Sequence, residues 1–160
     1  MSREPRLGGL TRTIWQWVRR EIERDVLAAG FTDLGSAHIS VFRYPSAEGL
    51  RPTDLADDMQ ISKQSVNELL AHLERTGYIE RRPDPHDNRS KRVHLTARGK
   101  ELERVVWRAA ERAEHRAGEL LGEERFAGVR RGLADLVARL TAGADADTDA
   151  GSDEAAPTPR

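Results

Sequence analysis

A run of polar side chains at the start of one helical segment has the residue types that read nucleic-acid bases. The run comprises Ser62, Lys63, Gln64, Ser65 and, shortly after, Asn67. Glutamine can pair with adenine through two hydrogen bonds, and serine can reach a base edge or a phosphate. Lys63 is better suited to a phosphate contact. Taken alone, the run would be interpreted as a solvated helix start with a good cap at Ser62. The basic segment that follows it favours the other interpretation, contact with DNA.

Cations gather in that following segment. Lys91 and Arg92, with Arg81 and Arg82, are candidate neighbours of phosphate groups. Because a strand alternates its faces, at most one residue of each adjacent pair should face DNA. Each of these side chains could equally be a solvated surface charge. The net charge of the whole chain is only -1, since an acidic C-terminal tail offsets the basic stretch.

The elements that would position these side chains form a compact pattern. A short helix over residues 53–59, opened by Pro52, leads directly into a helix that Ser62 caps and that ends before Gly77. Two alternating runs, 78–82 and 91–95, enclose a loop of turn-forming residues over 83–90. A helix-turn-helix followed by a basic hairpin is the layout of a winged helix. Such a unit can place its second helix in a DNA groove and its loop against the backbone.

Long amphipathic helices flank this unit. One begins at Leu7 and ends near Gly30, and a weaker helix over 34–44 is broken by residues 45–49. After the hairpin, Thr96 caps a helix whose apolar stripe reaches Leu121, and a last helix covers 123–140. These stripes exceed what a small winged unit could cover, so we expect a homodimer that interleaves them.

The expected fold is therefore mainly α with a small β-hairpin: a winged helix-turn-helix lobe plus long dimerisation helices from both termini. We expect a dimerisation helix in residues 1–33, a DNA-binding lobe in 34–99 and further dimerisation helices in 100–142. Residues 143–160 are acidic, aromatic-free and of low complexity, which indicates a disordered tail.

Several classes of protein are excluded by what the chain lacks. It has no cysteine, which excludes disulfides, thiolate catalysis and thiol-based redox sensing. No apolar run approaches the ~20 residues of a membrane span, and the N-terminus lacks a signal-peptide core, so we expect a cytoplasmic protein with no membrane partner. No phosphate-binding loop, nucleophile elbow or paired-carboxylate motif is present, so we expect no enzyme.

We also expect no cofactor and no metal site. The chain has five histidines, but none of them shows a close metal-ligand spacing such as H-x-x-x-H. They are His38, His72, His86, His94 and His115.

Taken together, these motifs resemble the MarR family (multiple-antibiotic-resistance regulators). The family pattern is a Leu-Glu pair, a glycine, a basic pair, Asp-x-Arg and Leu-Thr-x-x-Gly. The matching segments here are Leu73-Glu74, Gly77, Arg81-Arg82, Asp87-Asn88-Arg89 and Leu95-Thr96-Ala97-Arg98-Gly99. The order and spacing agree, and the resemblance extends over residues 7–140.

The resemblance implies an obligate dimer with two winged lobes that represses transcription from a pseudo-palindromic operator. In many members a small, often phenolic, ligand binds between the dimerisation helices and the lobe and releases DNA. Cysteine oxidation, the route of other members, is closed here. The Asp-x-Arg motif implies that Arg89 enters a minor groove from the wing tip. Asp87 would orient Arg89 or tie down the loop, and an Asx-turn is an equal alternative for it.

Three aromatic side chains are candidates for lining an effector pocket: Trp15, His38 and Trp107. Trp15 and Trp107 lie off the apolar stripes of their helices, whereas Trp17 lies on its stripe and is expected to pack. The partners we expect are thus double-stranded DNA, a second copy of the chain and a small aromatic or hydrophobic effector.

One residue departs from the family pattern. Relatives often have arginine where this chain has Glu68. A carboxylate there would repel phosphate or accept a hydrogen bond from a cytosine amino group. The departure predicts an operator preference unlike that of better-known relatives.

Two alternative functions remain open at this stage. The first is a winged-helix module without an effector, which would bind DNA in an architectural role. The second is a protein-protein interaction module whose contact surface includes the acidic tail.

Overall fold

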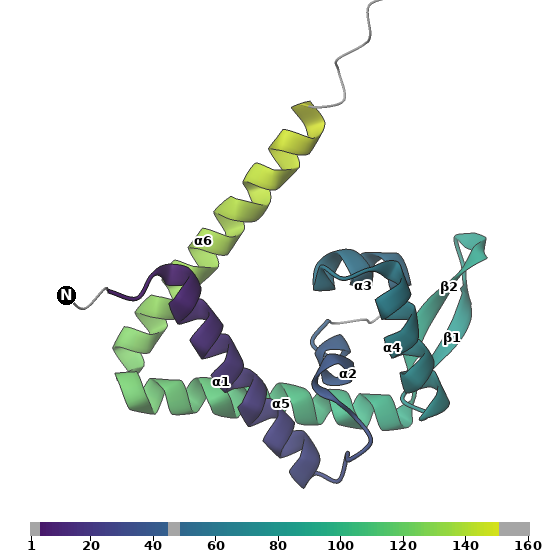
Figure 1. The fold of residues 1–160 in the computed structure, drawn as a ribbon, viewed down its shortest axis with the longest axis horizontal. Coiled ribbons are helices and arrows are strands. Elements are labelled where there is room, and N and C mark those ends of the chain that lie inside the picture. Colours follow the sequence, from purple (N-terminus) through teal and green to yellow (C-terminus); the bar gives the residue numbers. More distant parts are fainter. Residues whose placement is uncertain (1–3, 45–48, 151–160) are drawn as a thin grey trace, which may run out of the picture. The chain divides into compact units, whose positions relative to one another are not determined.

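The computed structural model describes residues 4–44 and 49–150 (Figure 1). The chain divides into two compact units, Met1–Ala113 and Glu114–Arg160. The first unit contains helices α1 to α4, the hairpin and α5 as far as Ala113. The second contains the end of α5 and helix α6. No helix in the described ranges is long and apolar enough to cross a membrane.

Helix α1, Leu7–Ala28, enters the core of the first unit only at its C-terminal end. Ile22 and Val26 are buried there, whereas Leu7, Leu10 and Ile14 are exposed. Gly30, at φ 92°, ends the helix as predicted. Helix α2, Ser36–Val41, is shorter than the predicted segment 34–44. Of the break expected at residues 45–49, residues 45–48 lie outside the described residues.

Helices α3, Pro52–Met59, and α4, Lys63–Arg75, form the predicted helix-turn-helix. Gln60 makes the turn in the left-handed region at φ 53°, and Ser62 begins α4 by accepting a hydrogen bond from the Ser65 amide at 3.1 Å. One face of α4 buries Val66, Leu70 and Leu73 in the common core. The opposite face therefore points to solvent.

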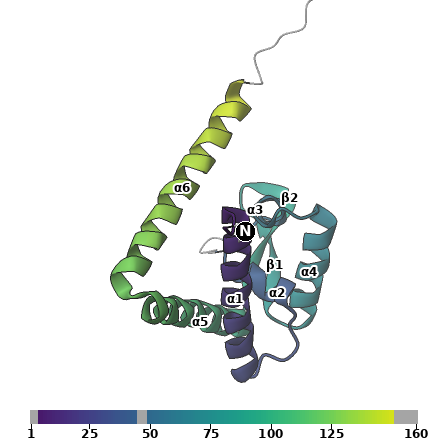
Figure 2. The ribbon, with the colours of Figure 1, turned by 60° about the vertical axis from the view of Figure 1, so that its left-hand side comes forward.

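Strands β1, Ile79–Asp84, and β2, Asp87–Leu95, pair antiparallel next to α4 (Figures 1 and 2). The expected loop over 83–90 is wrong: pairing continues to Asp84 opposite Asp87, and only Pro85 and His86 connect the strands. Pro83 is tolerated because this two-stranded sheet has open edges. Leu50 extends the sheet by bridging Val93, with N–O distances of 2.9 and 2.8 Å.

Helix α5, Ala97–Leu121, begins two residues after the end of β2. The Thr96 hydroxyl accepts from the Gly99 amide at 3.2 Å, which confirms the predicted cap. It also lies 2.6 Å from the Gly77 carbonyl, to which it donates. Gly99 passes so close to β1 that a Cβ atom there would lie 2.0 Å from the Tyr78 carbonyl oxygen. Leu102, Val106 and Ala109 then join the core of the first unit.

Residues of α1, the winged lobe and α5 thus share one core, although the predicted domain division placed them in three segments. The ends of α1 and α5 that enter it belong to the same compact unit as the lobe, so the first unit runs past the predicted boundaries at 33/34 and 99/100. The functional roles assigned to those segments stay predictions.

In the second unit, Gly122 at φ 91° separates α5 from α6, Glu123–Ala150. The predicted end at Leu140 is wrong, because the helix continues ten residues further. Four of the residues 141–150 are alanine, the strongest helix former, so the composition that suggested disorder also permits helix. Residues 151–160 of the predicted tail lie outside the described residues.

Candidate nucleic-acid interface

The five polar residues predicted to contact DNA from the helix lie at the exposed N-terminal end of α4. Ser62, Lys63, Gln64, Ser65 and Asn67 are all exposed. Among residues 62–67 only Val66 is buried, and it begins the inward-facing stripe that continues through Leu70 and Leu73. The hydroxyls of Ser62 and Ser65 also form a hydrogen bond with each other, at 2.9 Å, at the N-terminal cap of the helix. The first turn of α4 in addition presents the positive end of the helix dipole, which favours a phosphate.

Gln64 is held by a neighbour on this face. Its Nε2 donates to Oε1 of Glu68 at 3.0 Å, one turn further along α4. The residue that departs from the family pattern therefore contacts a candidate base-reading residue.

The turn end of the hairpin is organised by a buried carboxylate, Asp84, that was not among the predicted site residues. Asp84 is 1% exposed and accepts from Nε of Arg51 at 2.9 Å and from Nε of Arg92 at 3.0 Å. The His86 amide donates to its other oxygen at 2.9 Å. This backbone hydrogen bond, with those from Arg92 and Arg51, lowers the pKa of Asp84 to about 2 against the opposing effect of burial. The signal in the sequence was Asp-Pro before a two-residue turn.

The predicted alternation of cations along the hairpin is present. Lys91 is exposed, whereas the side chain of Arg92 is 16% exposed and is used by Asp84. The Arg92 guanidinium is thus engaged by Asp84 inside the lobe, and a contact from Arg92 to DNA stays a prediction. On β1, Arg81 pairs with Glu74 of α4 at 3.3 Å, and Arg82 pairs with its neighbour Glu80.

Arg89 is the third residue of β2, close to the hairpin tip. Its side chain lies outside the described residues, so its entry into a minor groove stays a prediction. Asp87 is exposed and is the partner of Asp84 in the strand register. Its carbonyl accepts from the Ser90 hydroxyl at 3.2 Å. A role for Asp87 in orienting Arg89 likewise stays a prediction.

A second polar cluster joins the hairpin to the helices behind it. Asp33 accepts from the Tyr78 hydroxyl at 2.6 Å and from Arg98 at 3.0 Å, and the Arg98 guanidinium lies 4.4 Å from the Tyr78 ring centroid. The Tyr78 hydrogen bond lowers the pKa of Asp33. Burial, together with that bond, raises the pKa of Tyr78. The cluster ties the start of β1 to α5 and thereby fixes where the hairpin leaves the lobe.

The three candidates for an effector pocket are not brought together. The guanidinium carbon of Arg43 lies 4.2 Å from the centroid of the Trp15 ring. Trp15 also lines a hollow between α1 and α2. Trp107 is 48% exposed in a different shallow hollow along α5. His38 caps α2 by accepting from the Gly35 amide at 3.1 Å, and its ring stacks on His72 at 4.1 Å. Burial, with the neighbouring His72, lowers the pKa of His38.

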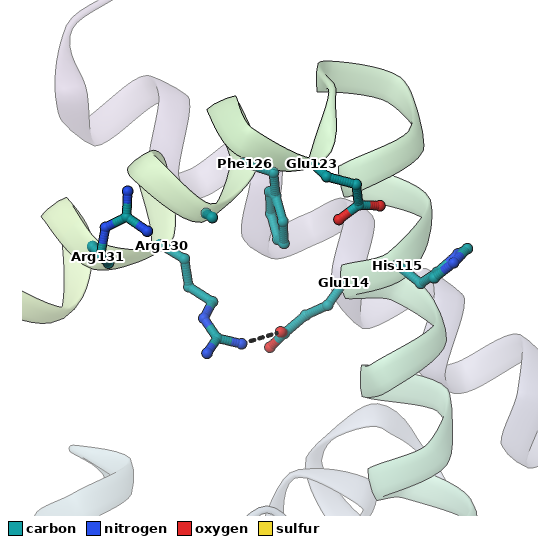
Figure 3. A pocket seen from close by; sticks show the side chains of 7 residues that line it. Glu114, His115, Glu123, Phe126, Arg130 and Arg131 are labelled. Atoms are coloured by element: carbon teal, nitrogen blue, oxygen red, sulfur yellow. Dashed lines mark hydrogen bonds and ion pairs between the residues drawn. The ribbon is translucent and has the colours of Figure 1, made fainter.

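The second unit has a hollow of its own, about 450 Å³ in volume, between the end of α5 and the start of α6. Figure 3 shows the Phe126 ring directed into it and Arg130 reaching across to Glu114, at 3.0 Å. His115 and Glu123 also line it (Figure 3). Across the described ranges, no group of three His, Asp or Glu side chains is arranged to hold a metal ion.

Comparison with known proteins relates this lobe to a family. The MarR family model matches residues 32–90, which include the helix-turn-helix and most of the hairpin. The chain is 34% identical over 103 residues to the transcriptional activatory protein BadR of Rhodopseudomonas palustris. It is 35% identical over 105 residues to the HTH-type transcriptional regulator PetP of Rhodobacter capsulatus. These matches cover 62% and 63% of this chain but only 57% and 61% of BadR and PetP.

Solved structures agree over a longer stretch. A crystal structure of MarR superposes with a TM-score of 0.71 at 26% identity, covering 89% of this chain and 98% of the other. A MarR transcriptional regulator from Methanosarcina mazei gives a TM-score of 0.70 at 22% identity, covering 83% and 94%. The predicted fold, mainly α with a winged hairpin and helices at both termini, is confirmed.

Proposed function

Because this chain belongs to the MarR family, we propose that it regulates transcription by binding double-stranded DNA at a specific sequence. The observation that carries the proposal is the outward face of α4. Its first turns present only polar side chains, from Ser62 to Asn67, beside a hairpin that exposes Lys91. In this proposal α4 lies in a major groove and reads base edges, and the hairpin contacts the flanking backbone.

We propose that the protein binds as a homodimer. Helix α6 exposes a row of apolar side chains at helical spacing, Val129, Leu133, Leu136, Val137 and Leu140. An apolar row of this length is unfavourable in water and is typical of a helix that packs on a partner. Two copies related by a two-fold axis would place their α4 helices in successive major grooves, about 34 Å apart. The operator would then be pseudo-palindromic.

We further propose that the protein is a repressor released by a small aromatic or hydrophobic effector. Trp15 and Trp107 support this, because both are large aromatic side chains that remain 40% and 48% exposed. An aromatic ligand could stack on either ring, and Arg43 could add a charge beside Trp15. A ligand shifts the DNA-binding equilibrium only as far as it binds one form better than the other. Titration of a panel of phenolic compounds, followed by tryptophan fluorescence, tests for such a ligand.

The sign of regulation has a second candidate. BadR is described as an activatory protein, so an activator is the alternative to a repressor. Transcript levels of the genes beside the operator decide between them. Deletion of the protein raises those levels if it represses and lowers them if it activates.

The DNA-binding proposal is tested by fluorescence anisotropy. A selection from random duplexes supplies the operator, and a scrambled duplex of the same composition is the reference. We expect Lys63→Ala and Lys91→Ala each to weaken binding to both duplexes and to lower the slope of log Kd against log salt by about one. Lys100→Ala removes an exposed cation of α5 and serves as the matched control, with no change expected.

The outcomes separate the rival functions. Specific, effector-insensitive binding across the ligand panel would instead favour an architectural module. Equal affinity for the selected and scrambled duplexes, with a flat salt dependence, would overturn the DNA-binding proposal and favour a protein-protein interaction module.

A further inference from the structure

The hydrogen bond between Gln64 and Glu68 restricts how the glutamine amide can face a base. Both side chains lie on the exposed face of α4, and Nε2 of Gln64 donates to Oε1 of Glu68 at 3.0 Å. Residues four apart are neighbours on a helix surface, so the pair is set by the local sequence. Ser62 and Ser65 are joined to each other at the cap, which leaves Glu68 as the side chain that orients the amide.

The direction of the amide follows from chemistry. A carboxylate has no proton to donate and can only accept hydrogen bonds. Gln64 must therefore turn its amino group toward Glu68, which directs its carbonyl oxygen away from Glu68. One proton of the amino group is used by this bond, and the second remains available to a base.

This orientation suits one base and opposes another. Adenine presents an amino donor and the N7 acceptor in the major groove, and these match the outward carbonyl and the remaining amide proton of Gln64. Guanine presents two acceptors, O6 and N7, at the same edge. It would place O6 against the Gln64 carbonyl oxygen, and two acceptors cannot form a hydrogen bond with each other. A glutamine without this neighbour could turn its amino group to guanine.

We propose that Glu68 is a positioning residue that makes the operator position facing Gln64 prefer adenine to guanine. This inference rests on the proposed function, since it requires that α4 enters the major groove. An exposed glutamine–glutamate pair on a helix contributes little to stability in water. Its effect on recognition arises when DNA displaces the surrounding water, because a wrongly directed carbonyl then has no alternative partner.

The experiment compares two operator duplexes that differ only at the position facing Gln64, with an A·T pair in one and a G·C pair in the other. That position is the one at which Gln64→Ala loses discrimination. For the wild-type chain we expect Kd to be at least about tenfold lower for the A·T duplex, the discrimination of one bidentate contact. With Glu68→Ala we expect the two Kd values to agree within about twofold.

Further variants distinguish an effect of Glu68 on the orientation of the Gln64 amide from effects of its charge or of altered folding. Glu68→Gln keeps an acceptor but can turn its own amide, so we expect intermediate discrimination. The double variant Gln64→Ala/Glu68→Ala should discriminate no less than Gln64→Ala alone, because Glu68 acts through Gln64. Glu68 is exposed, so the Tm of each single variant should equal that of the wild type. Glu101→Ala, an exposed carboxylate of α5, is the control for overall charge.

The two proposals fail in different ways. Absence of any preference for the selected operator over the scrambled duplex would reject the proposed function itself. Specific operator binding with a wild-type preference retained in Glu68→Ala would reject the role of Glu68 and leave the function standing. A uniform gain in affinity for both duplexes, with the ratio unchanged, would likewise show that Glu68 only repels phosphate.

Discussion

Lys91 and Arg92 are neighbours in β2, but they serve different purposes. The alternation of a strand predicted that only one could face outward, and it is Lys91 that does. Arg92 instead shares the carboxylate of Asp84 with Arg51, which comes from the segment before α3. The sequence could not show this, because the three residues meet only after the hairpin folds against that segment. Asp84 thus secures the hairpin to the lobe.

We expect Asp84→Asn to loosen the hairpin without removing a cation from its outer face. The neutral amide leaves two guanidinium groups without their shared negative charge. Affinity for the operator should fall by about fivefold while the salt slope stays unchanged, because positioning is lost and no phosphate contact is removed. Anisotropy at several salt concentrations measures both quantities. Glu80→Gln, which alters the exposed pair with Arg82, is the matched control, and an equal loss there would contradict the role of Asp84.

The same carboxylate predicts a pH dependence of stability. The pKa of Asp84 is lowered from 3.8 to about 2, so the folded state binds its proton less readily than the unfolded chain does. Its contribution to the free energy of unfolding is therefore full above pH 3.8 and is lost as the pH falls toward 2. Urea melts over this range should show wild type and Asp84→Asn converging at the acidic end. A difference that is constant with pH would rule out this linkage.

At the scale of elements, the Leu-Thr-x-x-Gly motif has a physical explanation. Thr96 begins α5 and also binds the Gly77 carbonyl, so the turn after α4 and the start of α5 meet at one hydroxyl. Gly99 allows α5 to approach the Tyr78 carbonyl, where no side chain fits. This junction determines the direction in which the hairpin leaves the lobe.

We expect Gly99→Ala to destabilise the protein by about 3 kcal/mol, because the added methyl would overlap backbone and the helix or the strand must move. Thermal or urea unfolding measures the loss. Gly8→Ala is the control: no atom lies within 4 Å of the added methyl, and little change is expected. Equal stability of the two variants would show that α5 does not need this close approach.

At the scale of the whole molecule, the exposed apolar row of α6 is the surface through which we expect two copies to associate. Leu136 is 39% exposed in the single chain, so a charged residue there should not disturb the fold of one copy. We expect Leu136→Glu to yield monomers in analytical ultracentrifugation. Operator affinity should fall by more than about 100-fold, since two linked half-site contacts become independent. Ala138→Glu introduces the same charge on the opposite face of α6 and should leave both properties unchanged. A dimeric Leu136→Glu protein would show that the assembly does not use this row.

The sequence alone determined the elements and the polar face of α4, because helical and strand periods, caps and glycine positions act over a few residues. It also predicted the family from short motifs in a specific order. It misjudged the ends of the hairpin and of α6, where alanine and turn residues permit more than one local structure. Only the tertiary structure showed the pairing of Asp84 with Arg51 and Arg92 and the Asp33–Tyr78–Arg98 cluster. Each depends on partners many positions away, and burial and charge pairing arise only when those segments meet.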